Sequence, residues 1–176
     1  NNRLIFVPDL NENGSNYGNF NFKVNDGTSD SDVASITLNV LAVNDPPVVG
    51  NSNVSTYEDT EIAFSISNLN YSDTEGSSIS GIRILGFSLN NSHQGTLYLD
   101  ANNNDSFDNG EQISTNQVVS ASNISNGHLR FYPNTNDNDA STHFASITFE
   151  ANDGSNYSSS SGNVYIYVQP VDDAPN

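Results

Sequence analysis

The sequence has 176 residues, enough for one domain or for one and a fraction. It contains 21 Asp and Glu against four Lys and Arg, a formal net charge of -17, so the phosphates of nucleic acids and anionic membranes would repel it. We therefore expect no nucleic-acid partner. The sequence has no Cys, which excludes a disulfide framework, and it has no run of 18 apolar residues, so we expect no membrane insertion.

The composition still favours a folded protein. Only 34% of the residues are hydrophobic and the mean hydropathy is -0.50, but the chain carries nine Phe and eight Tyr, and its apolar residues fall in short alternating runs. No signal peptide is visible. Because the sequence opens inside what resembles a strand, we interpret it as an excised fragment.

Residues 1–43 contain three strand signals, at 3–7, 18–24 and 33–41. A piece of about 40 residues rarely holds a hydrophobic core alone. We therefore interpret 1–43 as the C-terminal part of a preceding repeat. It could pack on the neighbouring unit, exchange between chains, or result from a misplaced boundary.

A linker is expected at residues 44–47, Asn-Asp-Pro-Pro. Two consecutive prolines stiffen the chain and disfavour a central strand, so this segment marks the boundary between units. The opposite phasing, with a domain built from roughly residues 1–125, stays open.

Residues 48–173 form the complete repeat, in which short strand signals are bounded by turn residues. In each signal apolar residues alternate with polar ones, which directs one face inward and leaves the other in water. We therefore predict an all-β fold, a seven-stranded antiparallel Greek-key β-sandwich of the cadherin or immunoglobulin type. The signals lie at 54–57; at Ile62, Phe64 and Ile66; at Ile82, Ile84 and Phe87; at Leu97 and Leu99; at Leu129 and Phe131; at Ile147 and Phe149; and at Val164, Ile166 and Val168.

The two parts of the sequence repeat each other. Residues 20–27, "FNFKVNDG", match 147–154, "ITFEANDG", and residues 36–47, "ITLNVLAVNDPP", match 164–175, "VYIYVQPVDDAP". Residues 4–14, "LIFVPDLNENG", also match 129–139, "LRFYPNTNDND". The offset between matching stretches drifts only from 125 to 128 residues, so one repeat recurs with small loop insertions. Residues 174–176 then begin the next linker.

Acidic residues gather in loops together with Asn and Gly, as in "DLNENG", "NDGTSDSD", "SDTEG" and "DANNND". A charged coat that serves only solubility would be spread over the outward faces of strands. Clustered carboxylates repel one another unless a counter-ion is present. We therefore favour bound cations over a solvated acidic surface.

The stretch "DANNNDSFDNGE" follows the spacing of an EF-hand calcium loop, in which oxygens at positions 1, 3, 5, 7, 9 and 12 surround the ion. Position 6, normally Gly, is Asp105, a residue type that tolerates a left-handed backbone better than most. Strand-like and turn-like flanks predict a calcium loop without the EF-hand helices, and the alternative is an Asn-rich turn without metal. The expected Ca²⁺ ligands are Asp100, Asn102, Asn104, the carbonyl of Ser106, Asp108 and Glu111.

Other acidic clusters carry weaker signals. Asp26 and Asp153 lie in matching Asn-Asp-Gly turns, where they could bind metal or simply make the turn. A third cluster lies before the second strand of the repeat, after it, and in the linker, and we expect its members to converge on one end of a sandwich. Its members are Glu58, Asp59, Asp73, Glu75 and Asp45.

The segments "VNDPPV" and "VDDAPN" resemble the Asp-x-Asn-Asp-Asn-x-Pro linkers of cadherin repeats. Together with "GTLYLD", "GHLRFYPNTN" and "ITFEANDG", they make nearly the whole chain similar to the tandem cadherin-like repeats of very large bacterial surface adhesins. The resemblance implies an extracellular, extended, non-enzymatic repeat with neighbouring repeats of the same chain as partners and with calcium at the junctions.

The resemblance also implies ligands at those junctions. Asn44 and Asp45 match the linker ligands, Glu58 matches the acid of the first strand, and Asp73 and Glu75 match the Asp-x-Asp pair. The match is incomplete, because Glu75 replaces an Asp, the linker lacks its second Asn, and an Asp-Arg-Glu motif is missing from the sequence.

Two functions compete. The first is a calcium-stiffened spacer in cell adhesion. The second is a carbohydrate-binding module for cell-surface glycans or polysaccharide, because Tyr98, Tyr165 and Tyr167 occupy the outward phase of their strands, or because the calcium itself binds sugar. An enzyme is not expected, since His93, His128 and His143 lack metal-ligand spacing and are interpreted as surface residues.

Overall fold

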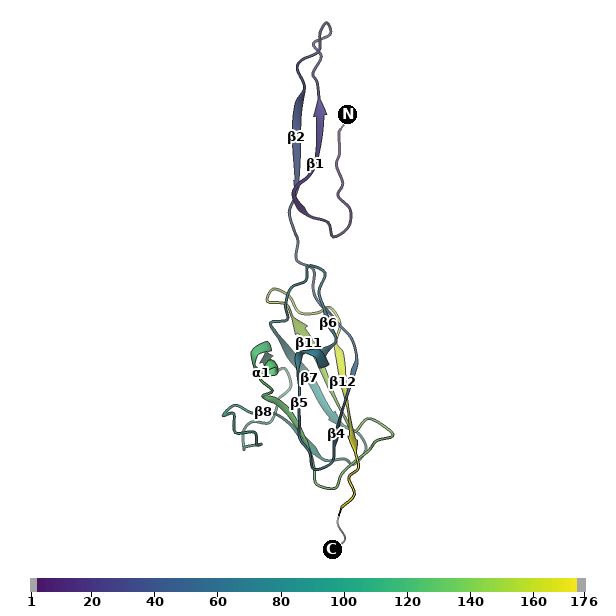
Figure 1. Ribbon diagram of the computed structural model, residues 1–176, viewed down its shortest axis with the longest axis vertical. Coiled ribbons are helices and arrows are strands. Elements are labelled where there is room, and N and C mark those ends of the chain that lie inside the picture. The colour runs from purple at the N-terminus through teal and green to yellow at the C-terminus, as the bar shows by residue number, and fades with distance from the viewer. Residues whose placement is uncertain (1–2, 174–176) are drawn as a thin grey trace. The chain divides into compact units, whose positions relative to one another are not determined.

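The computed structural model describes residues 3–173, and the chain divides into two compact units between Asn44 and Asp45 (Figure 1). The division falls within the residues 44–47 expected to form a linker. Within residues 3–173, no helix is long and apolar enough to cross a lipid bilayer.

The first unit is a single β-hairpin. Strand β1 (Gly14–Phe22) pairs antiparallel with β2 (Ala34–Val40), and the register shifts between Gly14 and Gly18. The expected strand at residues 3–7 does not form: Leu4, Ile5 and Val7 are 73–82% exposed. Alternating apolar residues become a strand only where a neighbouring strand completes their hydrogen bonds, and 3–7 pairs with none among the described residues.

The second unit contains two larger sheets and a short strand pair, so the expectation of an all-β fold is confirmed. The five-stranded sheet has the order β4 (Ser52–Tyr57), β12 (Gly162–Gln169), β11 (Ala145–Asn152), β7 (Gly81–Leu89) and β9 (Val118–Ser120). The three-stranded sheet has the order β5 (Ile62–Ala63), β10 (Leu129–Pro133) and β8 (Gly95–Leu99), and the short pair joins β3 (Val48–Val49) to β6 (Tyr71–Ser72).

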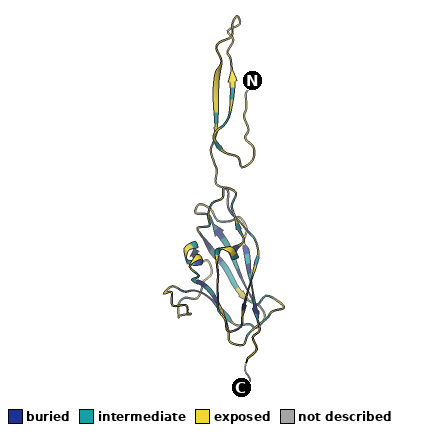
Figure 2. Cartoon of the chain, viewed as in Figure 1, coloured by how far each residue is buried: buried dark blue, intermediate teal, exposed yellow. Residues whose placement is uncertain are grey.

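The hydrophobic core lies between the two larger sheets (Figure 2). Along β11 and β12 every second residue is buried, as period-two alternation requires. Phe149 of β11 and Phe131 of β10 are both fully buried, from opposite sheets. All residues of the core cluster belong to the second unit.

The number and direction of strands differ from the sequence expectation. The second unit has ten strands, β3 to β12, instead of seven, and β4 runs parallel to β12, so the sandwich is not purely antiparallel. β3, β6 and β9 have only two or three residues each, too few to show alternation.

Ile66, expected in a strand, begins the 3₁₀ helix η1 (Ile66–Leu69). A capping box between Ser65 and Asn68 starts this turn, and Asn70 ends it with a left-handed φ of 44°. The only other helix in the described residues is α1 (Ala121–Ser125), whose cap Ser120 accepts a hydrogen bond from the Asn123 amide.

The internal repeat provides a matched pair of core mutations, because Phe22 and Phe149 occupy equivalent positions. Phe149 is fully buried, whereas Phe22 is 37% exposed. We predict that Phe149→Ala lowers the free energy of unfolding of the second unit by about 3–5 kcal/mol. Phe22→Ala should leave it nearly unchanged. Urea denaturation followed by circular dichroism measures both, and equal losses would contradict the placement of the core.

Candidate metal centre

The loop of residues 100–111 leaves the end of β8 and returns beside the same strand. The Leu99 amide donates to the Glu111 carbonyl at 2.9 Å, and the Ile113 amide donates to the Leu97 carbonyl at 3.0 Å. These bonds anchor both ends of the loop, so Asp100 and Glu111 lie close together although eleven positions separate them.

Asp100 organises the first half of the loop. Its fully buried carboxylate accepts hydrogen bonds from the amides of Asn104 at 3.2 Å and Asp105 at 3.0 Å, and its Oδ2 lies 4.0 Å from Nε of Arg130. Burial alone would raise the pKa of the Asp100 carboxyl. Backbone amides of residues 103–105 and the charge of Arg130 outweigh burial and lower this pKa below its ordinary value.

Alternate side chains of the loop meet at Asp108. The side-chain amides of Asn102 and Asn104 donate to the same oxygen, Oδ2 of Asp108, at 2.7 and 2.8 Å. Their own carbonyl oxygens accept the backbone amides of Asn104 and Ser106 at 3.1 and 3.0 Å. The structure thus brings three of the expected ligands into one hydrogen-bonded group.

Glu111 closes the loop from its C-terminal side. One carboxylate oxygen accepts the Ala101 amide at 2.9 Å and the other accepts the Asp108 amide at 3.0 Å. Both oxygens are therefore directed at the loop backbone. The amide of Ser106 is bonded within the loop, as described above.

The turn at position 6 has the predicted backbone conformation. Asp105 has a φ of 59°, the left-handed value that Gly supplies in the usual calcium loop. Its carboxylate, which is 70% exposed, pairs with Nη2 of Arg130. The same guanidinium binds Glu61 at 2.6 Å and donates from Nε to the Gly127 carbonyl at 2.8 Å.

Tyr98 does not offer an exposed ring. It lies on the outward phase of β8, as expected, but the loop folds back over the strand and buries it completely. The Phe107 ring packs edge-on against it with centroids 5.4 Å apart, and burial raises the pKa of the Tyr98 phenol. Phe107, an aromatic residue in a polar loop, was the one sequence signal for this contact. Tyr165 and Tyr167 are half-buried.

The acids expected to converge on one end of the sandwich lie at two ends. Glu58 follows β4, is only 3% exposed, and accepts the Val171 amide at 2.7 Å and the Asn138 side chain at 2.9 Å. Asp59 accepts the Asn136 amide at 3.1 Å. Both acids therefore lie at the end of the second unit where β4 and β12 finish.

The other acids lie beside the β3–β6 pair. The Asp45 amide donates to Glu75 at 3.0 Å, and Asp73 Oδ1 accepts the amides of Glu75 and Ser77. The second carboxylate oxygen of Asp73 is buried and has no hydrogen-bond partner within residues 3–173. The expectation of one cluster was wrong because the chain between Asp59 and Asp73 runs along the sandwich and separates them. Asn44 is exposed.

The paired Asn-Asp-Gly turns use their carboxylates locally. Asp26 Oδ1 accepts the amides of Thr28 and Ser29 at 2.8 and 2.9 Å, and these bonds lower the pKa of Asp26. Asp153 makes the equivalent two bonds in the second unit, at 2.6 and 2.7 Å. The observed role of both residues is turn formation.

His93 was expected at the surface, but its side chain is only 15% exposed. Its Nδ1 lies 2.7 Å from Asp137, its Nε2 lies 3.5 Å from Asp139, and its ring stacks on Phe144 at 4.4 Å. In residues 3–173, no three His, Asp or Glu side chains are arranged so that they could hold a metal ion by themselves. The loop at 100–111 would require amide and carbonyl oxygens as well.

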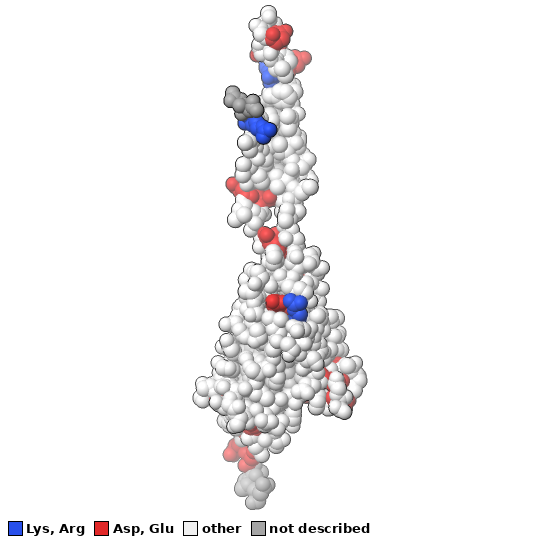
Figure 3. Space-filling view, turned by 180° about the vertical axis from the view of Figure 1, so that it is seen from behind, with Lys and Arg blue, Asp and Glu red and all other residues white. Residues whose placement is uncertain are grey.

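Comparison with protein-family models, curated proteins and solved structures gives no match. On the face of the molecule in Figure 3, Asp and Glu form small separate patches, Lys and Arg appear at a few places, and most of the surface is uncharged.

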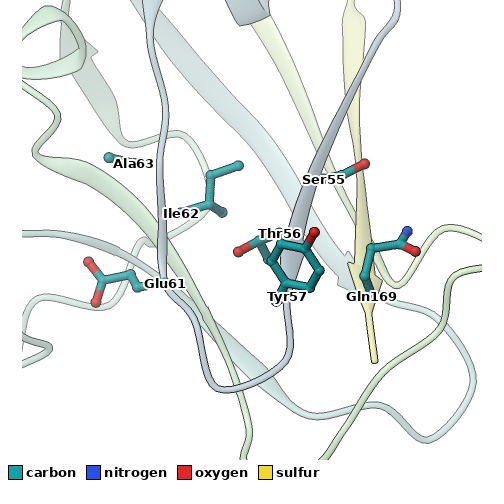
Figure 4. A pocket seen from close by; sticks show the side chains of 7 residues that line it. All are labelled: Ser55, Thr56, Tyr57, Glu61, Ile62, Ala63 and Gln169. Atoms are coloured by element: carbon teal, nitrogen blue, oxygen red, sulfur yellow. The ribbon is translucent and has the colours of Figure 1, made fainter. Parts of the chain in front are cut away.

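A pocket of about 490 Å³ lies between β4 and the start of β5. Figure 4 shows Tyr57 and Gln169 on adjacent strands, with Glu61 and Ile62 across from them. Tyr57 is 58% exposed, which makes it an accessible aromatic ring beside polar side chains.

The lowered pKa of Asp100 predicts acid sensitivity. The unfolded chain takes up a proton at this residue near its ordinary pKa of about 4, whereas the folded protein does so only at lower pH. The free energy of unfolding should therefore fall as pH drops below about 4. Asp100→Asn should lower it at neutral pH and flatten this dependence.

Urea titrations in EDTA between pH 7 and 2 measure the effect. Curves for the wild type and the variant that stay parallel over this range would contradict the assignment.

Proposed function

We propose that the chain is a calcium-binding extracellular repeat of a bacterial adhesin, acting as a calcium-stiffened spacer in cell adhesion. The observation that carries the proposal is the loop of residues 100–111, in which side chains spaced two residues apart turn toward the Asp108 carboxylate. Asp100, Asp108 and Glu111 place three carboxylates in one loop of twelve residues, and a divalent cation among them would relieve their mutual repulsion.

The donors of the loop fit a hard cation. Carboxylate, amide and backbone carbonyl oxygens are the ligands that Ca²⁺ takes, six to eight at about 2.3–2.6 Å. Asn102 and Asn104 would have to present their carbonyl oxygens, which now accept backbone amides. The residues that would hold the ion are Asp100, Asn102, Asn104, Ser106 through its carbonyl, Asp108 and Glu111.

Calcium at the junctions between repeats is part of the proposal. Glu58 and Asp59 lie at one end of the second unit, and Asp45, Asp73 and Glu75 lie at the other. Acids at both ends suit a string of repeats, because each end can face a neighbouring repeat of the same chain. The buried, unpartnered oxygen of Asp73 supports a cation there. Asn44 belongs to the same proposed set, whereas Asp26 is better explained by its turn.

The fold type is proposed on the strand order. A parallel pair between the first long strand and the last, with consecutive strands β7 and β8 in different sheets, fits a Greek-key sandwich of the cadherin or immunoglobulin type. Residues 1–43 would be the C-terminal part of a preceding repeat. The partial exposure of Phe22, against complete burial of the equivalent Phe149, supports this interpretation.

Calcium would contribute substantially to the stability of such a repeat. A site whose Kd lies a hundredfold below the ambient calcium concentration stabilises the folded state by about 2.7 kcal/mol. The total free energy of unfolding of a domain is only about 5–15 kcal/mol. Extracellular calcium is millimolar, so a weak site would also fill. We propose no enzymatic activity.

We predict that EDTA lowers the melting temperature of the second unit by roughly 10 °C and that excess calcium restores it. Asp100→Ala and Glu111→Ala should each remove one bound Ca²⁺ in isothermal titration calorimetry. Glu150→Gln, which removes a carboxylate that pairs with Arg83 on the five-stranded sheet, is the control and should leave the stoichiometry unchanged. Identical melting curves in EDTA and calcium would refute the proposal.

A second candidate function is glycan binding, and the pocket beside Tyr57 is the observation that favours it. An exposed aromatic ring can stack on a sugar, and the polar side chains of Ser55, Glu61 and Gln169 can bind its hydroxyl groups. The three tyrosines first considered for this role support it less, because Tyr98 is buried.

If this pocket binds polysaccharide, Tyr57→Ala should abolish retention in affinity electrophoresis, whereas Tyr132→Ala, a change of another exposed tyrosine, should not. Each variant is measured with calcium and with EDTA to separate binding by the pocket from binding by the ion. The glycan function fails if the wild type is not retained by a broad panel of polysaccharides under either condition.

A further inference from the structure

Arg130 connects the loop of residues 100–111 to the three-stranded sheet. It projects from β10 on the outer face, opposite Tyr98 of β8, and its side chain is only 18% exposed. One guanidinium contacts Glu61 at 2.6 Å, the Gly127 carbonyl at 2.8 Å, and Asp105 of the loop. Arg is suited to this position because its planar fork can serve several acceptors at once.

Cations are scarce in this chain, which has four Lys and Arg in total. Within the described part of the second unit the only other one is Arg83, which pairs with Glu150 on the five-stranded sheet. One of the two Lys or Arg side chains in the described part of this unit, Arg130, therefore contacts the acidic loop.

The partner of Arg130 is the residue that departs from the calcium-loop pattern. Gly is usual at position 6, yet Asp105 adopts the left-handed φ of 59° and uses its carboxylate to bind Arg130. The backbone amide of Asp105 also donates to Asp100 Oδ2 at 3.0 Å. The pair of Arg130 and Asp105 thus fixes the amide that orients the first expected ligand.

We propose that Arg130, acting through Asp105, is a positioning residue that holds the backbone of the metal-free loop in place and so strengthens calcium binding. The inference rests on the proposed calcium site. EF-hand loops are positioned by flanking helices, which this loop lacks. The Arg130–Asp105 pair takes over that role by tethering the middle of the loop to β10.

Two physical effects of Arg130 on the ion oppose each other. Its positive charge repels a divalent cation, which weakens binding. Its contacts order the loop beforehand, which removes part of the entropy cost of binding. Glu61 and Asp105 already neutralise the guanidinium, so we expect ordering to outweigh repulsion.

A double-mutant cycle on calcium affinity separates these effects, with Arg130→Gln, Asp105→Asn and their combination measured by calorimetry. Each single change should raise the calcium Kd by about fivefold, as expected for a partly exposed ion pair. The double variant should bind no more weakly than the weaker single variant, because both changes break one contact. Arg83→Gln, with the same change in net charge, is the control and should leave the Kd unchanged.

The sign of the Arg130→Gln effect decides the inference. A lower Kd in this variant would show that repulsion dominates and would overturn the proposal. A purely structural clamp would lower the melting temperatures in EDTA and in calcium by equal amounts and leave the Kd unchanged, which would also overturn it. If Arg130→Gln does not fold, the variant Asp105→Asn, changed at an exposed side chain, decides alone. A calcium Kd of this variant equal to that of the wild type would overturn the proposal. A wild type that binds no calcium would refute the calcium site itself.

Discussion

The loops of this protein depend on hydrogen bonds from backbone amides to Asp carboxylates. The chain has no Cys, and its connections are long and polar, so unpaired amides in the loops need acceptors from nearby side chains. Asp26, Asp100, Asp139 and Asp153 each accept at least two backbone amides within five residues of themselves. For Asp26 and Asp100 these bonds lower the pKa of the carboxyl. At Asp139 the Thr142 hydroxyl lowers the pKa most, and the backbone amides add to its effect. Part of the acidic character of the sequence therefore serves to build its turns.

This constraint changes how the clustered acids are interpreted. Carboxylates that already accept backbone amides are partly stabilised without a metal, so clustering alone is weaker evidence for cations than the sequence indicated. The loop at 100–111 differs from the isolated turns. Asp108 receives two side-chain amides on one oxygen, and Asp100 is buried with a nearby Arg130. Because the backbone of this loop is already ordered, the entropy cost of binding an ion would fall mainly on the side chains of Asn102 and Asn104, which would have to turn their carbonyl oxygens toward it.

The sequence predicted the long strands and missed whatever depended on distant partners. Ile147, Phe149, Val164 and Ile166 alternate strictly, and the structure buries each of them. The strands β3, β6 and β9 left no periodic trace because they are so short. The outward phase of Tyr98 on its strand predicts an exposed ring, but the loop covers it, because a strand pattern carries no information on what folds over its outer face. The separation of Glu58 from Asp73 likewise depends on the path of the chain between them.

The internal repeat also shows that local sequence defines a hairpin but does not define its burial. β1 and β2 carry the apolar pattern of β11 and β12, and both hairpins pair antiparallel. Local sequence is therefore enough to define a hairpin and its apolar face. Burial of that face is a separate matter, because in the second unit it requires strands such as β10 from the other sheet. Phe22 and Phe149 share a position in the repeat and differ in exposure, since burial is a property of the assembled sandwich. A hairpin with exposed apolar residues gains free energy from any surface that covers them, so the interactions of the first unit must be sought in what it packs against.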